Sequence, residues 1–192
     1  MMKPKILCIG DSITRGYEVN IDQSYPSLLG MYLDLPVINL GVNGDTTAGM
    51  LSRIEAALKF HKPEIVLVLG GVNDLTLKSK PNVVFSNLVN MYRIIKHYNA
   101  IPVPCEILNV VSEDQIISKS SLFLAHKKVQ KRIQKLNKKI RAFADYDNLA
   151  VVSFAGNFTS KMYMDDGLHP NVLGYKTMAE TASICLKELL LK

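Results

Sequence analysis

The chain has 192 residues, 48% of them hydrophobic, so a single domain over residues 1–192 can bury a core without disulfides or a metal. No run approaches the ~18 apolar residues of a membrane span, and the apolar run Ile6 to Ile9 is too short for a signal peptide, so we expect a cytoplasmic protein. The 23 Lys and Arg outnumber the 17 Asp and Glu, and this net charge of +6 first suggests an anionic partner such as nucleic acid or a membrane surface.

Strands and helices are expected to alternate along the chain. Short apolar runs rich in β-branched residues predict five buried strands, at Ile6 to Ile9, Val37 to Leu40, Ile65 to Leu69, Val103 to Ile107 and Ala150 to Phe154. Apolar residues at helical spacing predict helices around residues 28–32, 50–58, 84–98, 129–143 and 172–189. This alternation is typical of an α/β fold with a parallel sheet that helices cover on both faces.

The positive charge is concentrated in one segment. Residues 126–141 contain eight basic residues and no acidic one, whereas the rest of the chain carries 15 basic and 17 acidic residues. The eight are Lys127, Lys128, Lys131, Arg132, Lys135, Lys138, Lys139 and Arg141. Because Val129, Ile133 and Leu136 form an apolar stripe in the same segment, we interpret it as an amphipathic helix with a solvated cationic face and expect no nucleic-acid partner. Weak contact with an anionic lipid surface is the alternative.

The sequence gives no sign of a metal or cofactor. Cys8, Cys105 and Cys185 are odd in number, widely separated and in apolar surroundings, which favours core thiols in a reducing compartment over disulfides. The Cys-x-x-Cys and His-Glu-x-x-His patterns of metal sites are absent from the sequence. The glycine-rich phosphate loops of a nucleotide-binding or FMN-binding module with the same alternation are absent as well.

Polar, glycine-containing segments follow the predicted strands. Gly10, Asp11 and Ser12 come directly after the first strand, and residues 41–47 and 70–74 follow the second and third. Residues 165–171 come after the fifth strand, past a loop. Because ligands of doubly wound sheets bind beyond the carboxyl ends of the strands, we expect these segments to meet at one edge.

Ser12, His169 and Asp166 are residue types that nucleophilic catalysis requires. A serine needs a base to take its proton, and histidine suits that role near neutral pH. Of the four histidines, His169 alone has a carboxylate three residues earlier within a turn-forming run, where it could hold the imidazole. Taken alone, the Gly-Asp-Ser and Asp-x-x-His patterns are each more common as ordinary loop structure, such as an Asx turn.

Acyl transfer also requires hydrogen-bond donors for the developing oxyanion. The backbone N–H groups of Ser12 and Gly44 and the side-chain amide of Asn73 are candidates, although Gly44 and Asn73 could equally serve as turn and capping residues. The remaining acidic residues of these loops are expected to organise the loops or to lie at the surface: Asp11, Asp45, Asp74 and Asp165.

Four ordered blocks of the sequence resemble the SGNH (GDSL) hydrolase family, above all its bacterial thioesterase, lysophospholipase and arylesterase branch. They are Gly-Asp-Ser-Ile-Thr-Arg-Gly-Tyr at 10–17, Asn-Gly-Asp-Thr-Thr at 43–47, Gly-Val-Asn-Asp at 71–74 and Asp-Gly-Leu-His-Pro-Asn at 166–171. The order and spacing of the blocks, and their positions after strands, extend the resemblance over nearly the whole chain.

The resemblance implies a three-layer α/β/α, flavodoxin-like fold and ester hydrolysis without a metal or cofactor. It implies that Ser12 is the nucleophile and that His169 and Asp166 are the base and acid of a triad. The implied oxyanion donors are the N–H groups of Ser12 and Gly44 and the amide of Asn73.

The substrate is left open by the sequence. The resemblance implies a lipid, lysophospholipid or small (thio)ester, and the alternative is a carbohydrate O-deacetylase that uses the same triad. The stretch from Leu108 to Ser120 carries no family motif, and it could equally line a substrate site or form an ordinary surface loop. The acyl-chain preference is therefore left undetermined. The oligomeric state and any transfer to acceptors other than water are likewise not indicated.

Overall fold

The computed structural model describes residues 3–111 and 126–191, and within them five parallel strands form one sheet. The strands are β1 (Ile6–Gly10), β2 (Val37–Gly41), β3 (Ile65–Leu69), β4 (Ile101–Glu106) and β5 (Val152–Ser153). Their order across the sheet is β2-β1-β3-β4-β5, which is the flavodoxin-like arrangement. The predicted α/β class with a five-stranded parallel sheet is therefore confirmed.

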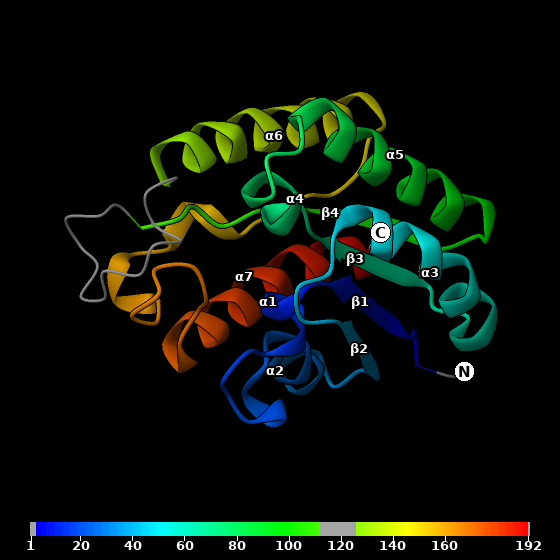
Figure 1. The fold of residues 1–192 in the computed structure, drawn as a ribbon. Coiled ribbons are helices and arrows are strands. Elements are labelled where there is room, and N and C mark those ends of the chain that lie inside the picture. The colour runs from blue at the N-terminus through cyan, green and yellow to red at the C-terminus, as the bar shows by residue number, and fades with distance from the viewer. Residues whose placement is uncertain (1–2, 112–125, 192) are drawn as a thin grey trace.

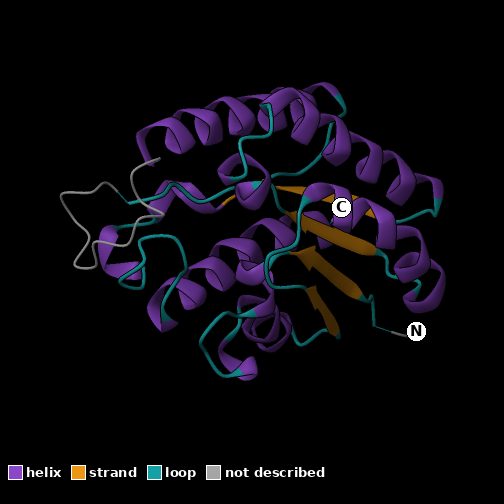
Figure 2. Cartoon of the chain, viewed as in Figure 1, coloured by secondary structure: helices purple, strands orange, loops and turns teal. Residues whose placement is uncertain are grey.

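Helices cover both faces of the sheet (Figure 1). One layer contains α3 (Thr47–His61), α5 (Pro81–His97) and α6 (His126–Tyr146), and the other contains α2 (Tyr25–Leu33) and α7 (Val172–Leu190). Figure 2 shows the strands as the middle layer between them. Short helices α1 (Ser12–Arg15) and α4 (Val72–Thr76) follow β1 and β3 directly. None of the helices within residues 3–111 and 126–191 combines the length and the apolar character needed to cross a membrane.

The core is built on the central strands. Every residue of β1 and β3 is buried, whereas the edge strand β2 is only half-buried. Continuous apolar runs such as Ile65–Leu69 suit a strand covered by helices on both sides, because both of its faces then contact side chains. The sheet thus forms a rigid base from which the loops at its carboxyl edge project.

Four strands differ from their predicted bounds. β1 and β2 each extend one residue further, to Gly10 and Gly41, and β4 begins two residues early, at Ile101. β4 ends at Glu106, one residue early, because the side-chain amide of Asn137 on α6 takes both backbone groups of Ile107 in place of a strand neighbour. β5 comprises only Val152–Ser153, since the chain enters a 3₁₀ turn at Phe154. Further short 3₁₀ turns span Ile21–Gln23 and Ser160–Met162.

The cationic face of α6 is only partly free in the structure. Arg132 donates to the carbonyl of Leu75 on α4 (3.0 Å), and Arg141 pairs with the buried carboxylate of Glu106 (2.8 Å). The exposed row that remains consists of Lys128, Lys131, Lys135 and Lys138. Arg132 therefore binds the helix to α4 and Arg141 binds it to β4, and contact of the lysine row with an anionic surface stays a prediction.

The three cysteines are free thiols. Cys8 on β1 and Cys105 on β4 are buried, which raises the pKa of each thiol above its ordinary value. Cys185 on α7 is half-buried, so it is not the core residue that the sequence suggested. Its side chain lies at the border between the helix and the sheet, where its thiol contacts the carbonyl of Val151.

Close packing of α1 against the end of β2 predicts a strict need for glycine at position 41. An added Cβ there would lie 2.0 Å from the backbone nitrogen of Arg15 and 2.5 Å from its Cα. Gly41→Ala should therefore lower the free energy of unfolding by about 3 kcal/mol, measured by urea denaturation. The control is Gly156→Ala, whose added Cβ would meet Ser153 Oγ at 4.0 Å, an ordinary contact. Equal stability of the two variants would contradict this packing.

Candidate active site

The carboxyl ends of the three neighbouring strands β1, β2 and β3 lie level with one another. Gly10 is paired with Gly41 on one side and with Leu69 on the other. The segments that follow these residues therefore emerge at the same edge of the sheet. The strand order reverses between β1 and β3, and such a switch point is where doubly wound sheets place their ligand sites.

Ser12 is the first residue of the one-turn helix α1. The side chain of Asp11 caps this turn by accepting the N–H of Ile13 (2.9 Å), and Gly16 ends it in the left-handed conformation at φ +86°. Ser12 is 6% exposed, and its Oγ lies 2.9 Å from Nε2 of His169. The hydroxyl is thus held within hydrogen-bond distance of an imidazole 157 residues away in the sequence.

Asp166 holds both the ring and the backbone of His169. Its Oδ2 lies 2.5 Å from Nδ1 of the imidazole, and its Oδ1 accepts the backbone N–H groups of Leu168 and His169, each at 2.9 Å. An ionised carboxylate can only accept hydrogen bonds, so the proton of the neutral ring is placed on Nδ1. Nε2 is left with a lone pair, which accepts the Ser12 hydroxyl.

The loop that carries Asp166 and His169 is fixed by its own backbone. Met164 donates to the carbonyl of His169 (2.8 Å), and Tyr163 and Pro170 form an isolated antiparallel bridge. Gly167 turns the chain between the two functional residues at φ +64°, a value that favours glycine. These contacts place the carboxylate and the imidazole by local geometry, before any contact with α1.

The pKa values of two carboxyl groups at this edge are shifted in opposite directions. Burial alone would raise the pKa of Asp166, but hydrogen bonds from the His169 ring and from two backbone N–H groups outweigh it and lower the pKa. Asp11 is 1% exposed, and loss of hydration raises its pKa to about 7, an effect that the Ile13 N–H only partly offsets. Asp166 is therefore ionised at neutral pH, whereas Asp11 titrates there.

Arg53 of α3 connects the loops after β1 and β2. Its guanidinium forms two hydrogen bonds to the Asp45 carboxylate (2.7 and 2.9 Å) and donates to the carbonyls of Leu40 (2.9 Å) and Gly10 (3.0 Å). Gly10 lies two residues before Ser12, and Asp45 directly follows Gly44. One planar cation thus fixes two of the candidate loops relative to each other.

Asn73 and Gly44 project from the neighbouring loops. The Asn73 amide donates one N–H to the carbonyl of Asp45 (2.9 Å), which leaves its second N–H available. Gly44 has φ +75° and no heavy atom within 4 Å of a Cβ added to it, so its peptide is open to a ligand. The loop after β3 is anchored by Asp74, which accepts the backbone N–H and the hydroxyl of Thr47 (2.9 and 2.7 Å).

The structure brings most of the sequence-derived candidates to this edge. Asp11, Asp45 and Asp74 are buried or nearly buried and organise loops, whereas Asp165 is exposed. Arg53 was not singled out from the sequence, because an arginine on the polar side of a helix carries no signal of the carbonyls that it reaches. Among residues 3–111 and 126–191, no three His, Cys, Asp or Glu side chains are grouped to hold a metal ion.

The stretch from Leu108 to Ser120, for which the sequence left substrate lining and an ordinary surface loop open, lies outside the described residues from position 112 onward. Its described beginning is packed inward, since Leu108 and Val111 are buried. The backbone N–H of Val111 donates to the carbonyl of Gly167 (3.0 Å). The start of this stretch is thus bonded directly to the loop that carries the candidate base.

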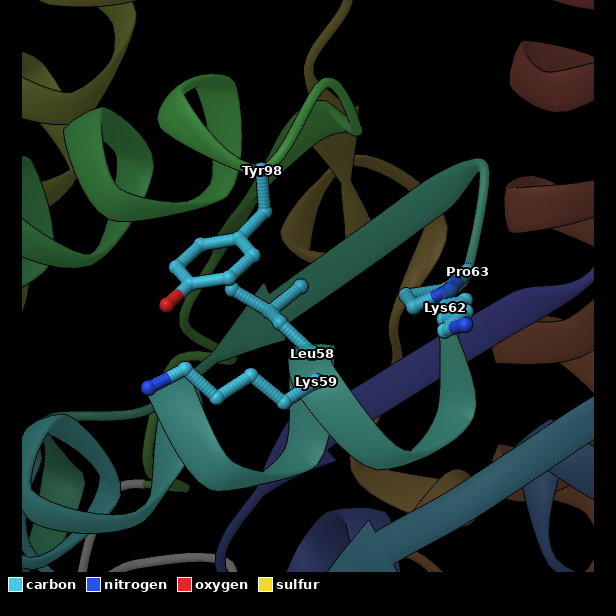
Figure 3. Close-up of a pocket in the computed structure, with 5 residues that line it drawn as sticks. All are labelled: Leu58, Lys59, Lys62, Pro63 and Tyr98. Atoms are coloured by element: carbon cyan, nitrogen blue, oxygen red, sulfur yellow. The ribbon is translucent and has the colours of Figure 1, made fainter.

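A separate shallow pocket lies at the opposite, amino-terminal edge of the sheet (Figure 3). It is lined by Leu58, Lys59, Lys62, Pro63 and Tyr98. The ammonium group of Lys59 pairs with Glu55 (2.9 Å), which also accepts the hydroxyl of Tyr98 (2.7 Å). The pocket contains none of the candidate residues.

Comparison with known proteins identifies relatives of this chain. The model of the GDSL-like lipase/acylhydrolase family matches residues 8–177. An arylesterase from Vibrio mimicus is 41% identical over 101 residues, which are 50% of each chain. Thioesterase 1/protease 1/lysophospholipase L1 from Escherichia coli K12 is 33% identical over 104 residues, 53% of this chain and 50% of the relative. The matches thus span about half the length of these curated relatives.

The fold is similar to that of a solved structure over nearly the whole chain. The crystal structure of TesA superposes with a TM-score of 0.79 at 25% sequence identity. The superposition covers 96% of this chain and 99% of that one. The described fold is therefore that of GDSL-type proteins.

The raised pKa of Asp11 predicts a pH-dependent stability. Because the folded state binds this proton more tightly than the unfolded state, Asp11 costs stability as the pH rises from about 4 to about 7. Asp11→Asn removes this cost. The free energy of unfolding of the variant minus that of the wild type should therefore grow by about 3 kcal/mol as the pH rises from about 4 to about 7. Urea denaturation at a series of pH values measures the difference. Exposed Asp165→Asn is the control and should show no such trend; a constant difference for Asp11→Asn would contradict the prediction.

Proposed function

Because the chain belongs to the GDSL-like lipase/acylhydrolase family, we propose that it is a serine esterase that hydrolyses carboxylic esters and thioesters through an acyl-enzyme on Ser12. The observation that carries the proposal is the hydrogen-bonded series from Ser12 Oγ to His169 Nε2 (2.9 Å) and from His169 Nδ1 to Asp166 (2.5 Å). A hydroxyl, a base and an orienting carboxylate in this order are the parts of a catalytic triad.

In the first step, His169 Nε2 takes the proton of Ser12 as Oγ attacks the carbonyl carbon of the ester. The imidazolium that forms keeps its Nδ1 proton on Asp166, whose negative charge stabilises it. This proposal is supported by the lowered pKa of Asp166, since the carboxylate must be ionised where the reaction runs.

The negative charge on the carbonyl oxygen requires donors at the same edge. The N–H of Ser12 has no partner within its own helix, because it is the first residue of α1. The open peptide of Gly44 supplies a second N–H, and the second amide hydrogen of Asn73 a third. Arg53 and Asp45 hold the loop of Gly44, so these donors are oriented before the substrate binds.

The tetrahedral intermediate collapses when His169 gives its proton to the leaving alcohol or thiol. Water then attacks the acyl-enzyme, with the same imidazole taking its proton, and the intermediate releases the acid and restores Ser12. Every proton moves through His169 Nε2, and Asp166 stays ionised throughout.

The names of the relatives suggest the substrates. The two relatives are an arylesterase and a thioesterase and lysophospholipase, so we propose aryl esters, acyl thioesters and lysophospholipids as substrates of this chain. A panel of 4-nitrophenyl esters from acetate to laurate, acyl thioesters, lysophosphatidylcholine and acetylated sugars tests this. Preference for acetylated sugars over all others would instead favour a carbohydrate O-deacetylase.

Loss of the nucleophile should abolish turnover. Ser12→Ala is expected to lower kcat by several orders of magnitude on every ester of the panel, because removal of one triad member disables attack. The matched control is Ser52→Ala, which removes an exposed hydroxyl on α3 and should leave kcat unchanged. Undiminished hydrolysis by purified Ser12→Ala would rule out the proposed function.

Asn73→Ala tests the oxyanion donors. Loss of one preorganised donor typically costs about 10²–10³-fold in kcat, and KM should change little because the bond strengthens only in the transition state. Steady-state kinetics on one ester provides both constants. Asn82→Ala, at an exposed position of α5, is the control. An unchanged kcat for Asn73→Ala would remove this side chain from the oxyanion site.

A further inference from the structure

The aromatic ring of Tyr17 lies against the face of the His169 imidazole. The two ring centroids are 4.2 Å apart and the planes are inclined by 28°, which is a stacked contact. The mechanism described above uses both nitrogens of His169, through Ser12 and Asp166, but assigns nothing to the faces of its ring. Tyr17 covers one of these faces, and the imidazole side chain is 13% exposed.

The backbone of Tyr17 is attached to both halves of the site. Its N–H lies 3.1 Å from the carbonyl of Ser12 and 3.0 Å from the hydroxyl of Tyr175, so it is shared between them. Tyr175 is fully buried on α7, the helix that begins three residues after His169. The backbone of Tyr17 is therefore held by the turn that carries Ser12 and by the helix that follows His169.

Acidic groups surround the imidazole, and the Tyr17 ring beside them is neutral. Asp166 contacts Nδ1, and the buried carboxyl of Asp11 interacts with His169 at longer range. The Glu18 carboxylate beside the phenol raises the pKa of Tyr17, so the ring next to His169 stays neutral. A neutral aromatic face attracts a cation through its quadrupole.

We propose that Tyr17 is a positioning residue of the esterase, whose ring keeps the His169 imidazole in the plane that joins Ser12 to Asp166 and stabilises the imidazolium formed during attack. This role rests on the proposed function. It requires the aromatic ring and not the hydroxyl, and it predicts an effect on kcat with little effect on KM, because the ring contacts the base.

Two substitutions separate the ring from its hydroxyl. Tyr17→Phe keeps the stacked ring and should retain kcat within about twofold. Tyr17→Leu removes it and should lower kcat by about tenfold at unchanged KM. The acidic limb of the pH profile of kcat/KM arises because His169 must be neutral to accept the proton. Without the aromatic face the imidazolium is less stable, so the midpoint of this limb should move to lower pH by about half a unit in Tyr17→Leu.

Thermal unfolding shows whether each variant is folded. If Tyr17→Leu is not folded, Tyr17→Met serves as a second non-aromatic variant. Wild-type kcat and an unshifted acidic limb in a folded non-aromatic variant would overturn the proposal. A raised KM with unchanged kcat would also overturn it, because the ring would then contact the substrate. Activity in Ser12→Ala would refute the proposed function itself, whereas an inactive Ser12→Ala with wild-type kinetics in Tyr17→Leu would refute only the role of Tyr17.

Discussion

The level register of the three strands β1, β2 and β3 is the constraint on which the site depends. Ladder hydrogen bonds pair Gly10 with both Gly41 and Leu69, so three chain segments leave the sheet at one height. The absence of a side chain at Gly41 lets α1 fold back across the end of β2. The turn of the proposed nucleophile and the loops of the proposed oxyanion donors are therefore placed by the sheet before any of their side chains interact.

A partly buried ion pair then joins these loops. The guanidinium of Arg53 satisfies the Asp45 carboxylate and two carbonyl groups at strand ends, which would be costly to leave unpaired away from water. The same loss of hydration destabilises ionised Asp11, which has fewer partners. The edge thus combines the Arg53–Asp45 ion pair with the Asp11 carboxyl group, which is hard to ionise. Such a combination is common where a site is preorganised at some cost in stability.

His169 is positioned from three directions at once. Its own loop supplies Asp166, the sheet edge supplies Ser12, and Tyr17 stacks on the ring face. Only the first of these contacts is local in sequence. As the proposed base, a histidine restrained in this way would lose little freedom when it accepts a proton, which is what preorganisation means in acyl transfer.

The sequence by itself determined the alternation of strands and helices, because apolar periodicity reflects which faces are buried. The three-residue spacing and the family resemblance together suggested the pairing of Asp166 with His169, and the structure shows the two side chains in contact. The sequence also indicated which glycine-containing loops would meet, since parallel strands end at a common edge. Only the tertiary structure decided that Arg53 reaches Gly10 and Leu40, that Arg141 pairs with buried Glu106, and that Tyr17 stacks on His169. These contacts join residues well separated in the chain. Their partners are backbone groups, a ring face or, for Arg141, a carboxylate on a distant strand, and none of these leaves a pattern in a single sequence.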